Sequence, residues 1–67
     1  MQYLQKRSIK RGELLTSIKL ERQFFDRIDA AAAATGQRWT DLVRAILREK
    51  PQGQSNASWL RVSLLEI

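Results

Sequence analysis

Cysteine and histidine are both absent from the chain. Without cysteine it can form no disulfide and no thiolate zinc site, and without histidine it lacks the commonest protein ligand of metal ions. The same two absences remove the usual nucleophiles and acid–base groups of enzymes. We therefore expect a protein that is not an enzyme and that has no metal site and no cofactor.

Long hydrophobic runs are absent too. No segment approaches the ~20 apolar residues of a transmembrane helix, and no signal-peptide stretch follows the basic first residues. We expect a cytoplasmic protein with no membrane-spanning segment. The length of 67 residues is small for a stable core, since a domain near 60 residues buries only about 60% of its unfolded surface. With disulfides and metals excluded, pairing with a second copy is the remaining way to enlarge the core.

Acidic residues are scarce, because seven Asp and Glu accompany 12 Lys and Arg, for a net charge of +5. Residues 1–20 contain five of the basic residues and one acidic residue. Four of the five net charges therefore lie in the first third of the chain. Such a concentration predicts a polyanionic partner, either nucleic acid or an anionic membrane surface.

The segment 13–20 alternates apolar and polar side chains, and this period of two predicts a short strand. One face of the strand carries Leu14, Thr16, Ile18 and Leu20, and the other carries Leu15, Ser17 and Lys19. We interpret the polar and basic residues 1–12, which end at Gly12, as a flexible arm. A lone strand cannot satisfy its backbone groups, so we expect it to pair with a second copy.

Three helices are expected after the strand. Apolar residues at three-four spacing predict a first helix over residues 22–35, which Gly36 ends. A similar pattern predicts a second helix over residues 39–49, with Pro51 beyond its end. A weaker pattern predicts a third helix over residues 56–66, although the crowded apolar residues there leave a strand open.

Three segments match, in order, the pattern of a known superfamily: residues 16–29 (strand into helix), 32–36 (helix end at a glycine) and 39–47 (second helix). On these segments the chain resembles the ribbon-helix-helix superfamily of DNA-binding proteins. The run 57–66 resembles the tail of a bacterial subfamily with an added C-terminal helix. The chain would then consist of a basic flexible arm (1–12), a ribbon-helix-helix domain (13–50), and a linker with a C-terminal helix (51–67).

The resemblance implies a mostly α fold with one short strand per chain, in an intertwined homodimer. The two strands would form an intermolecular antiparallel two-stranded ribbon, and the third helix would extend the dimer interface or join dimers into a dimer of dimers. The dimer core would contain Ile18, Leu20, Phe24, Ile28, Leu42, Val43, Ile46 and Leu47.

The resemblance also implies sequence-specific binding of double-stranded DNA by a bacterial or phage transcriptional repressor, with the ribbon in the major groove. Base contacts are expected from Leu15, Ser17 and Lys19. Phosphate contacts are expected from Lys6, Arg7, Lys10, Arg11, Arg38, Trp39 and Thr40. Trp39 and Thr40 would contribute backbone N–H groups at a helix start.

Two of these assignments have alternatives. Leu15 would contact a thymine methyl group, or it would lie at a frayed strand end and pack against the arm. Trp39 would pack against a phosphate or a deoxyribose, or it would cover the end of the core.

Two other functions fit parts of the pattern. An antitoxin would use the same fold to regulate its own expression and would bind a toxin through the apolar tail, residues 54–67. A basic peripheral membrane protein, or a protein that binds a partner helix, would use the positive charge differently. The alternating strand and the turn at Gly36 argue against this last class, so we expect no membrane partner.

Overall fold

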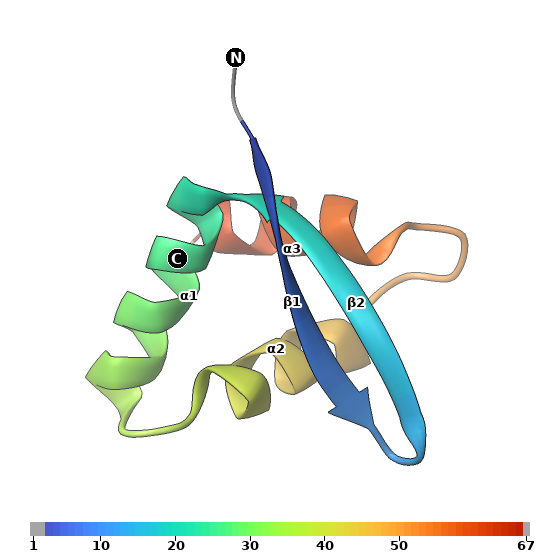
Figure 1. Ribbon diagram of the computed structural model, residues 1–67, viewed down its shortest axis with the longest axis horizontal. Coiled ribbons are helices and arrows are strands. Elements are labelled where there is room, and N and C mark those ends of the chain that lie inside the picture. The colour runs from blue at the N-terminus through green and yellow to red at the C-terminus, as the bar shows by residue number, and fades with distance from the viewer. Residues whose placement is uncertain (1–2, 67) are drawn as a thin grey trace.

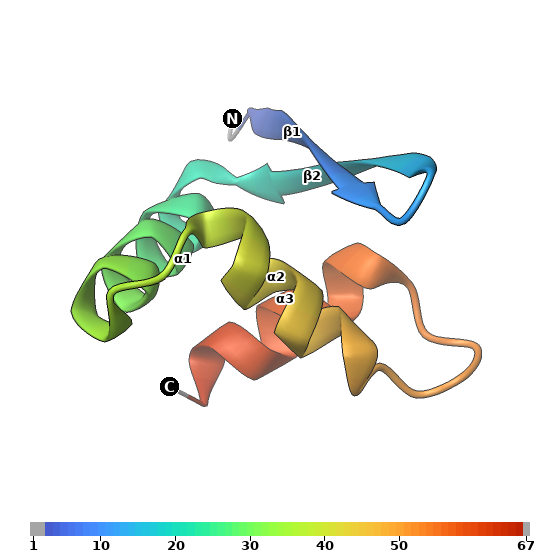
Figure 2. The same ribbon diagram turned by 90° about the horizontal axis from the view of Figure 1, so that it is seen from below.

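The computed structural model describes residues 3–66 and contains a β-hairpin followed by three helices (Figure 1). The elements are β1 (Leu4–Arg11), β2 (Leu14–Glu21), α1 (Arg22–Thr35), α2 (Trp39–Arg48) and α3 (Asn56–Leu65). Figure 2 shows two layers, with the hairpin lying over the three helices. The predicted ribbon-helix-helix order with a third helix is confirmed.

The hairpin pairs β1 with β2 in antiparallel register, from Leu4 opposite Glu21 to Arg11 opposite Leu14. A two-residue loop, Gly12 and Glu13, joins the strands. Gly12 has a φ of 64°, and Glu13 does not have a positive φ. A glycine at the first loop position is the requirement of a type II′ turn, whose twist matches that of the flanking strands. The loop therefore suits a tight hairpin within one chain.

The expectation of a flexible arm over residues 1–12 is wrong for residues 4–11, which form β1. The strand is held because its inner face reaches the core: Ile9 is only 1% exposed, and Arg7 is half-buried. The ribbon itself is two-stranded and antiparallel, as expected. Within the one chain of this structure its second strand is β1, and pairing with a second copy stays a prediction.

The helices begin and end close to the predicted residues. Gly36, with a φ of 70°, ends α1 in the left-handed conformation, and its N–H donates to the last turn. Ser55 caps α3, because its hydroxyl oxygen accepts a hydrogen bond of 3.1 Å from the N–H of Ser58. Residues 56–65 are thus a helix, and the alternative of a strand there is excluded.

The core lies between the hairpin and the helices. Of the residues assigned to a dimer core, five are buried within a single chain: Ile18, Leu20, Ile28, Val43 and Leu47. The other three, Phe24, Leu42 and Ile46, are partly buried and pack against that core. The core also contains four buried residues outside that set: Ile9, Phe25, Leu60 and Leu64.

Helix α3 is part of this core, because it packs on β2, α1 and α2. Leu60 and Leu64 are buried, and the indole Nε1 of Trp59 donates to the carbonyl oxygen of Ile46 at 2.8 Å. This packing gives no support to a free apolar tail for a toxin. Among residues 3–66, no helix has the length and apolar character needed to cross a membrane.

Candidate nucleic-acid interface

The face of the hairpin that points away from the helices is polar, basic and exposed. Its residues come from three cross-strand pairs: Lys6 with Lys19, Ser8 with Ser17, and Lys10 with Leu15. Residues directly opposite in an antiparallel pair share a face, and alternate residues along a strand do so too. We call these six residues the lysine–serine face.

The three residues expected to contact bases, Leu15, Ser17 and Lys19, form one row of this face, on β2. The other row lies on β1. The sequence did not predict it, because residues 1–12 have the composition of a flexible arm. It places Ser8 between Lys6 and Lys10, and the alternation of these three residues was the available signal. Leu15 is 73% exposed and paired with Lys10, so it does not lie at a frayed strand end.

The electrostatics of this face favour an anionic partner. Lys6 and Lys19 are directly opposite each other, and like charges in that position destabilise a strand pair. Neither lysine forms an ion pair with any acidic residue in the stretch 3–66. Glu21, at the end of β2, is held by Arg61 on α3, with Nε to Oε1 at 2.8 Å. That hydrogen bond lowers the pKa of Glu21.

Arg7 differs from the other basic residues of β1, because its guanidinium is engaged within the chain. Two of its nitrogens donate to the carboxylate oxygens of Asp29 on α1, at 2.8 and 2.9 Å. The guanidinium carbon also lies 4.5 Å from the ring centroid of Phe25 and 5.0 Å from that of Trp39. These hydrogen bonds raise the pKa of Arg7 and lower that of Asp29. Arg7 therefore joins the hairpin to the helices.

The same contacts explain Trp39. Its side chain is half-buried, packs against the core and stacks on Arg7. These contacts agree with the second alternative for Trp39, in which the indole covers the end of the core. Its backbone N–H and that of Thr40 still lie in the first turn of α2, where helix N–H groups have no partner within the helix.

The start of α2 also carries Arg38, whose side chain is 83% exposed. Its Nε donates to Asp41 at 3.3 Å, so part of its charge is compensated locally. Asp41 also accepts from Arg44, which in turn donates to the carbonyl oxygen of Lys10 at 2.8 Å. A chain of contacts thus links the start of α2 to the end of β1.

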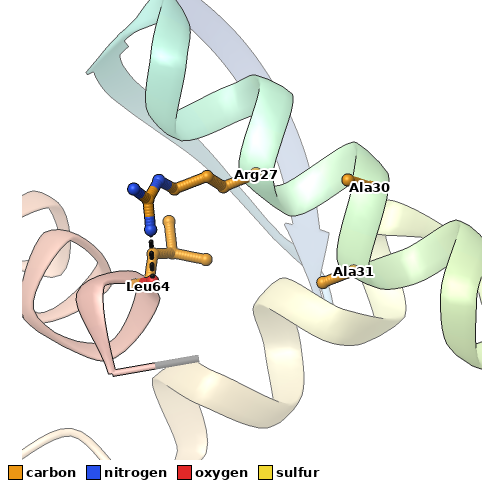
Figure 3. Close-up of a pocket in the computed structure, with 4 residues that line it drawn as sticks. All are labelled: Arg27, Ala30, Ala31 and Leu64. Atoms are coloured by element: carbon orange, nitrogen blue, oxygen red, sulfur yellow. Dashed lines mark hydrogen bonds between the residues drawn. The ribbon is translucent and has the colours of Figure 1, made fainter.

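A hollow of about 310 Å³ lies between α1 and α3, lined by Arg27, Ala30, Ala31 and Leu64. In it the guanidinium of Arg27 donates to the carbonyl oxygen of Leu64 at 3.3 Å (Figure 3). Apart from Arg27, its side chains are small or apolar. It shares no residue with the lysine–serine face.

In a comparison with protein families, residues 4–67 match the ribbon-helix-helix domain. No curated protein sequence and no solved structure matches the chain significantly. The family match includes β1 and α3 as well as the central elements, so it extends over nearly the whole chain. The chain belongs to the ribbon-helix-helix domain family, a family of DNA-binding regulators rather than of enzymes.

Proposed function

We propose that the protein is a sequence-specific double-stranded DNA-binding transcriptional regulator that acts as a homodimeric repressor in the cytoplasm, on the nucleoid. The observation that carries the proposal is the lysine–serine face, an exposed two-stranded ribbon whose facing lysines form no ion pair with an acidic residue of the stretch 3–66. A two-stranded ribbon has the width that the major groove admits. Phosphates bound beside the lysines would relieve the repulsion between Lys6 and Lys19.

The face supplies chemically distinct contacts. Lys19 donates to guanine O6 or N7, Ser17 donates or accepts, and Leu15 contacts a thymine methyl group. Lys6, Lys10 and Arg11 bind phosphates along the groove edge. Arg38 and the backbone N–H groups of Trp39 and Thr40 form a second phosphate anchor at the start of α2.

A homodimer is supported by apolar surface that one chain leaves uncovered. Phe24, Leu42 and Ile46 are only partly buried. On α3, Val62 and Leu65 are 42% and 63% exposed. Covering such side chains with a second copy would add the core that a chain of this length lacks.

The test is selection of bound fragments from a random DNA library, followed by titration of the selected site. Lys19→Ala should weaken binding to that site by ~1–3 kcal/mol and relax the preference at one base position. Arg48→Ala, at the exposed C-terminal end of α2, removes one positive charge away from the lysine–serine face and is the matched control. An equal loss on selected and random DNA for Lys19→Ala would contradict a base contact.

A further inference from the structure

Asp41 brings a negative charge to the place where the proposed function puts a DNA phosphate. It is the acidic residue in the first turn of α2, the helix start that carries Arg38 and the backbone N–H groups of Trp39 and Thr40. We infer that Asp41 limits the affinity of this second phosphate anchor, because its carboxylate engages the basic side chains that a phosphate would bind. The inference rests on the proposed function and adds to it a residue that opposes DNA binding.

The carboxylate of Asp41 lies between two arginines. One of its oxygens accepts a hydrogen bond from Nε of Arg38 at 3.3 Å, and the other accepts from a terminal nitrogen of Arg44 at 3.0 Å. Each ion pair joins residues three positions apart in the sequence. Such contacts form along a single helix, so they do not depend on how the hairpin pairs with a second copy.

The charges of these three residues favour competition between the carboxylate and DNA. Arg38 and Arg44 each carry a positive charge, and Asp41 compensates one of the two. A carboxylate in the first turn of a helix is attracted by the same N–H groups that attract a phosphate. A phosphate bound a few ångströms away is repelled, since physiological salt screens charges only beyond ~8 Å. Asp41 therefore weakens phosphate binding at this place whatever the base sequence.

The opposite role for Asp41 would be to orient Arg38 toward the DNA. The contact is too weak for that role, because the side chain of Arg38 is 83% exposed and is held by a single hydrogen bond of 3.3 Å. Arg44, by contrast, is also held by the carbonyl oxygen of Lys10, at 2.8 Å. Loss of the carboxylate therefore frees Arg38 and leaves Arg44 in place.

The experiment replaces Asp41 with asparagine, which keeps the size of the side chain and removes its charge. Binding of the full chain is measured on the selected DNA and on a duplex of random sequence, over a range of salt concentrations. We expect Asp41→Asn to bind both duplexes at least about threefold more tightly at low salt. Its affinity should also fall more steeply as the salt concentration rises. Unchanged or weaker binding would overturn the inference.

Two control variants test whether the effect belongs to this carboxylate. Asp41→Glu keeps the charge and should bind DNA within about twofold of the unaltered protein. Glu49→Gln removes a negative charge from an exposed residue at the other end of α2 and should gain less affinity than Asp41→Asn. A gain for either control as large as that for Asp41→Asn would overturn the inference.

Thermal denaturation separates this role from a purely structural one. Asp41→Asn loses two ion pairs and a favourable charge in the first turn of α2, so it should be slightly less stable than the unaltered protein. Tighter DNA binding by a less stable variant is the expected combination. A structural role would lower stability and DNA affinity together, and that result would overturn the inference.

Retention on heparin, a sulfated polyanion, tests the same carboxylate without a DNA site. Asp41→Asn should elute at a higher salt concentration than Glu49→Gln, and equal elution would count against the role of Asp41. If the unaltered protein selects no DNA sequence, the proposed function fails. The heparin comparison then still shows whether Asp41 limits the binding of anions at the start of α2.

Discussion

Arg7 on β1 and Asp29 on α1 form a bidentate ion pair, with nitrogen–oxygen distances of 2.8 and 2.9 Å. The two residues are 22 positions apart in the sequence. The pair fixes the hairpin, which carries the lysine–serine face, on the helices that support it. The sequence predicts a phosphate contact for Arg7, but in the structure its guanidinium orients the hairpin on the helices.

The first prediction concerns Asp29→Asn. Loss of the pair should lower the free energy of unfolding by ~0.2–1 kcal/mol, the range of partly exposed ion pairs, and should weaken DNA binding because the hairpin is less well oriented. If Arg7 instead bound a phosphate, the same substitution would free it, remove a negative charge and strengthen binding. Thermal denaturation and a DNA titration measure both effects.

The matched control is Asp26→Asn on the same helix. It removes the same charge near Arg7 but no hydrogen bond to it, and its ion pair is a 3.9 Å contact with Arg22, between side chains that are 67% and 78% exposed. Stability should change little, and DNA binding should stay equal or become slightly tighter. Equal behaviour of the two variants would contradict the role given to Asp29.

The second prediction concerns the anchoring of β1 in the core. Ile9→Ala should destabilise the protein by ~2–5 kcal/mol, as truncations of buried isoleucines do, because Ile9 is 1% exposed. Leu15→Ala, on the same hairpin but 73% exposed, should change stability by less than about 0.5 kcal/mol. Urea denaturation measures both. If the two variants were equally stable, residues 4–11 would be a flexible arm and not a strand anchored in the core.

Sequence patterns predicted the helical half of this fold well. The first helix was placed at the residues it occupies, because its apolar stripe has a clear helical period and Gly36 can adopt the left-handed conformation that ends it. The inner and outer faces of β2 were also assigned correctly over most of its length. The exception is Leu14, which lies next to the hairpin loop and is 73% exposed.

Strand β1 was missed for a physical reason. Its inner face carries one apolar residue, Ile9, beside the charged Arg7, so the alternation is weak. Arg7 is tolerated there only because Asp29, Phe25 and Trp39 meet it from distant parts of the chain. Such partners are tertiary and leave no local pattern. The Gly12 turn, after the polar row of Lys6, Ser8 and Lys10, was a further local signal of a hairpin.

The third prediction concerns acid. Hydrogen bonds from Arg7 and Arg61 hold the pKa of Asp29 and of Glu21 below their usual values, which are about 3.9 and about 4.3 in unfolded chains. A carboxyl with a lowered pKa in the folded state stabilises that state above its unfolded pKa. This stabilisation is lost as the pH falls through the folded-state value. The melting temperature should therefore fall as the pH is lowered below about 5.

The double variant Asp29→Asn/Glu21→Gln separates these two groups from the other carboxyls. It should melt at a lower temperature than the unaltered protein at neutral pH and should depend less on pH in the acid range. Asp26→Asn should keep the full acid dependence. If the double variant loses as much stability in acid as the unaltered protein does, the two ion pairs are not the source of the acid dependence.

The fourth prediction concerns the attachment of α3. Trp59→Phe keeps an aromatic ring but removes the hydrogen bond from Nε1 to the carbonyl oxygen of Ile46 on α2. The expected loss is ~0.5–1.5 kcal/mol, and in a domain of this size each kcal/mol lowers the melting temperature by about 4–8 °C. Trp39→Phe is the control, because the Trp39 ring acts by stacking on Arg7, and phenylalanine can stack in the same way. A melting temperature lowered as much by Trp39→Phe as by Trp59→Phe would show that the hydrogen bond does not fasten α3 to α2.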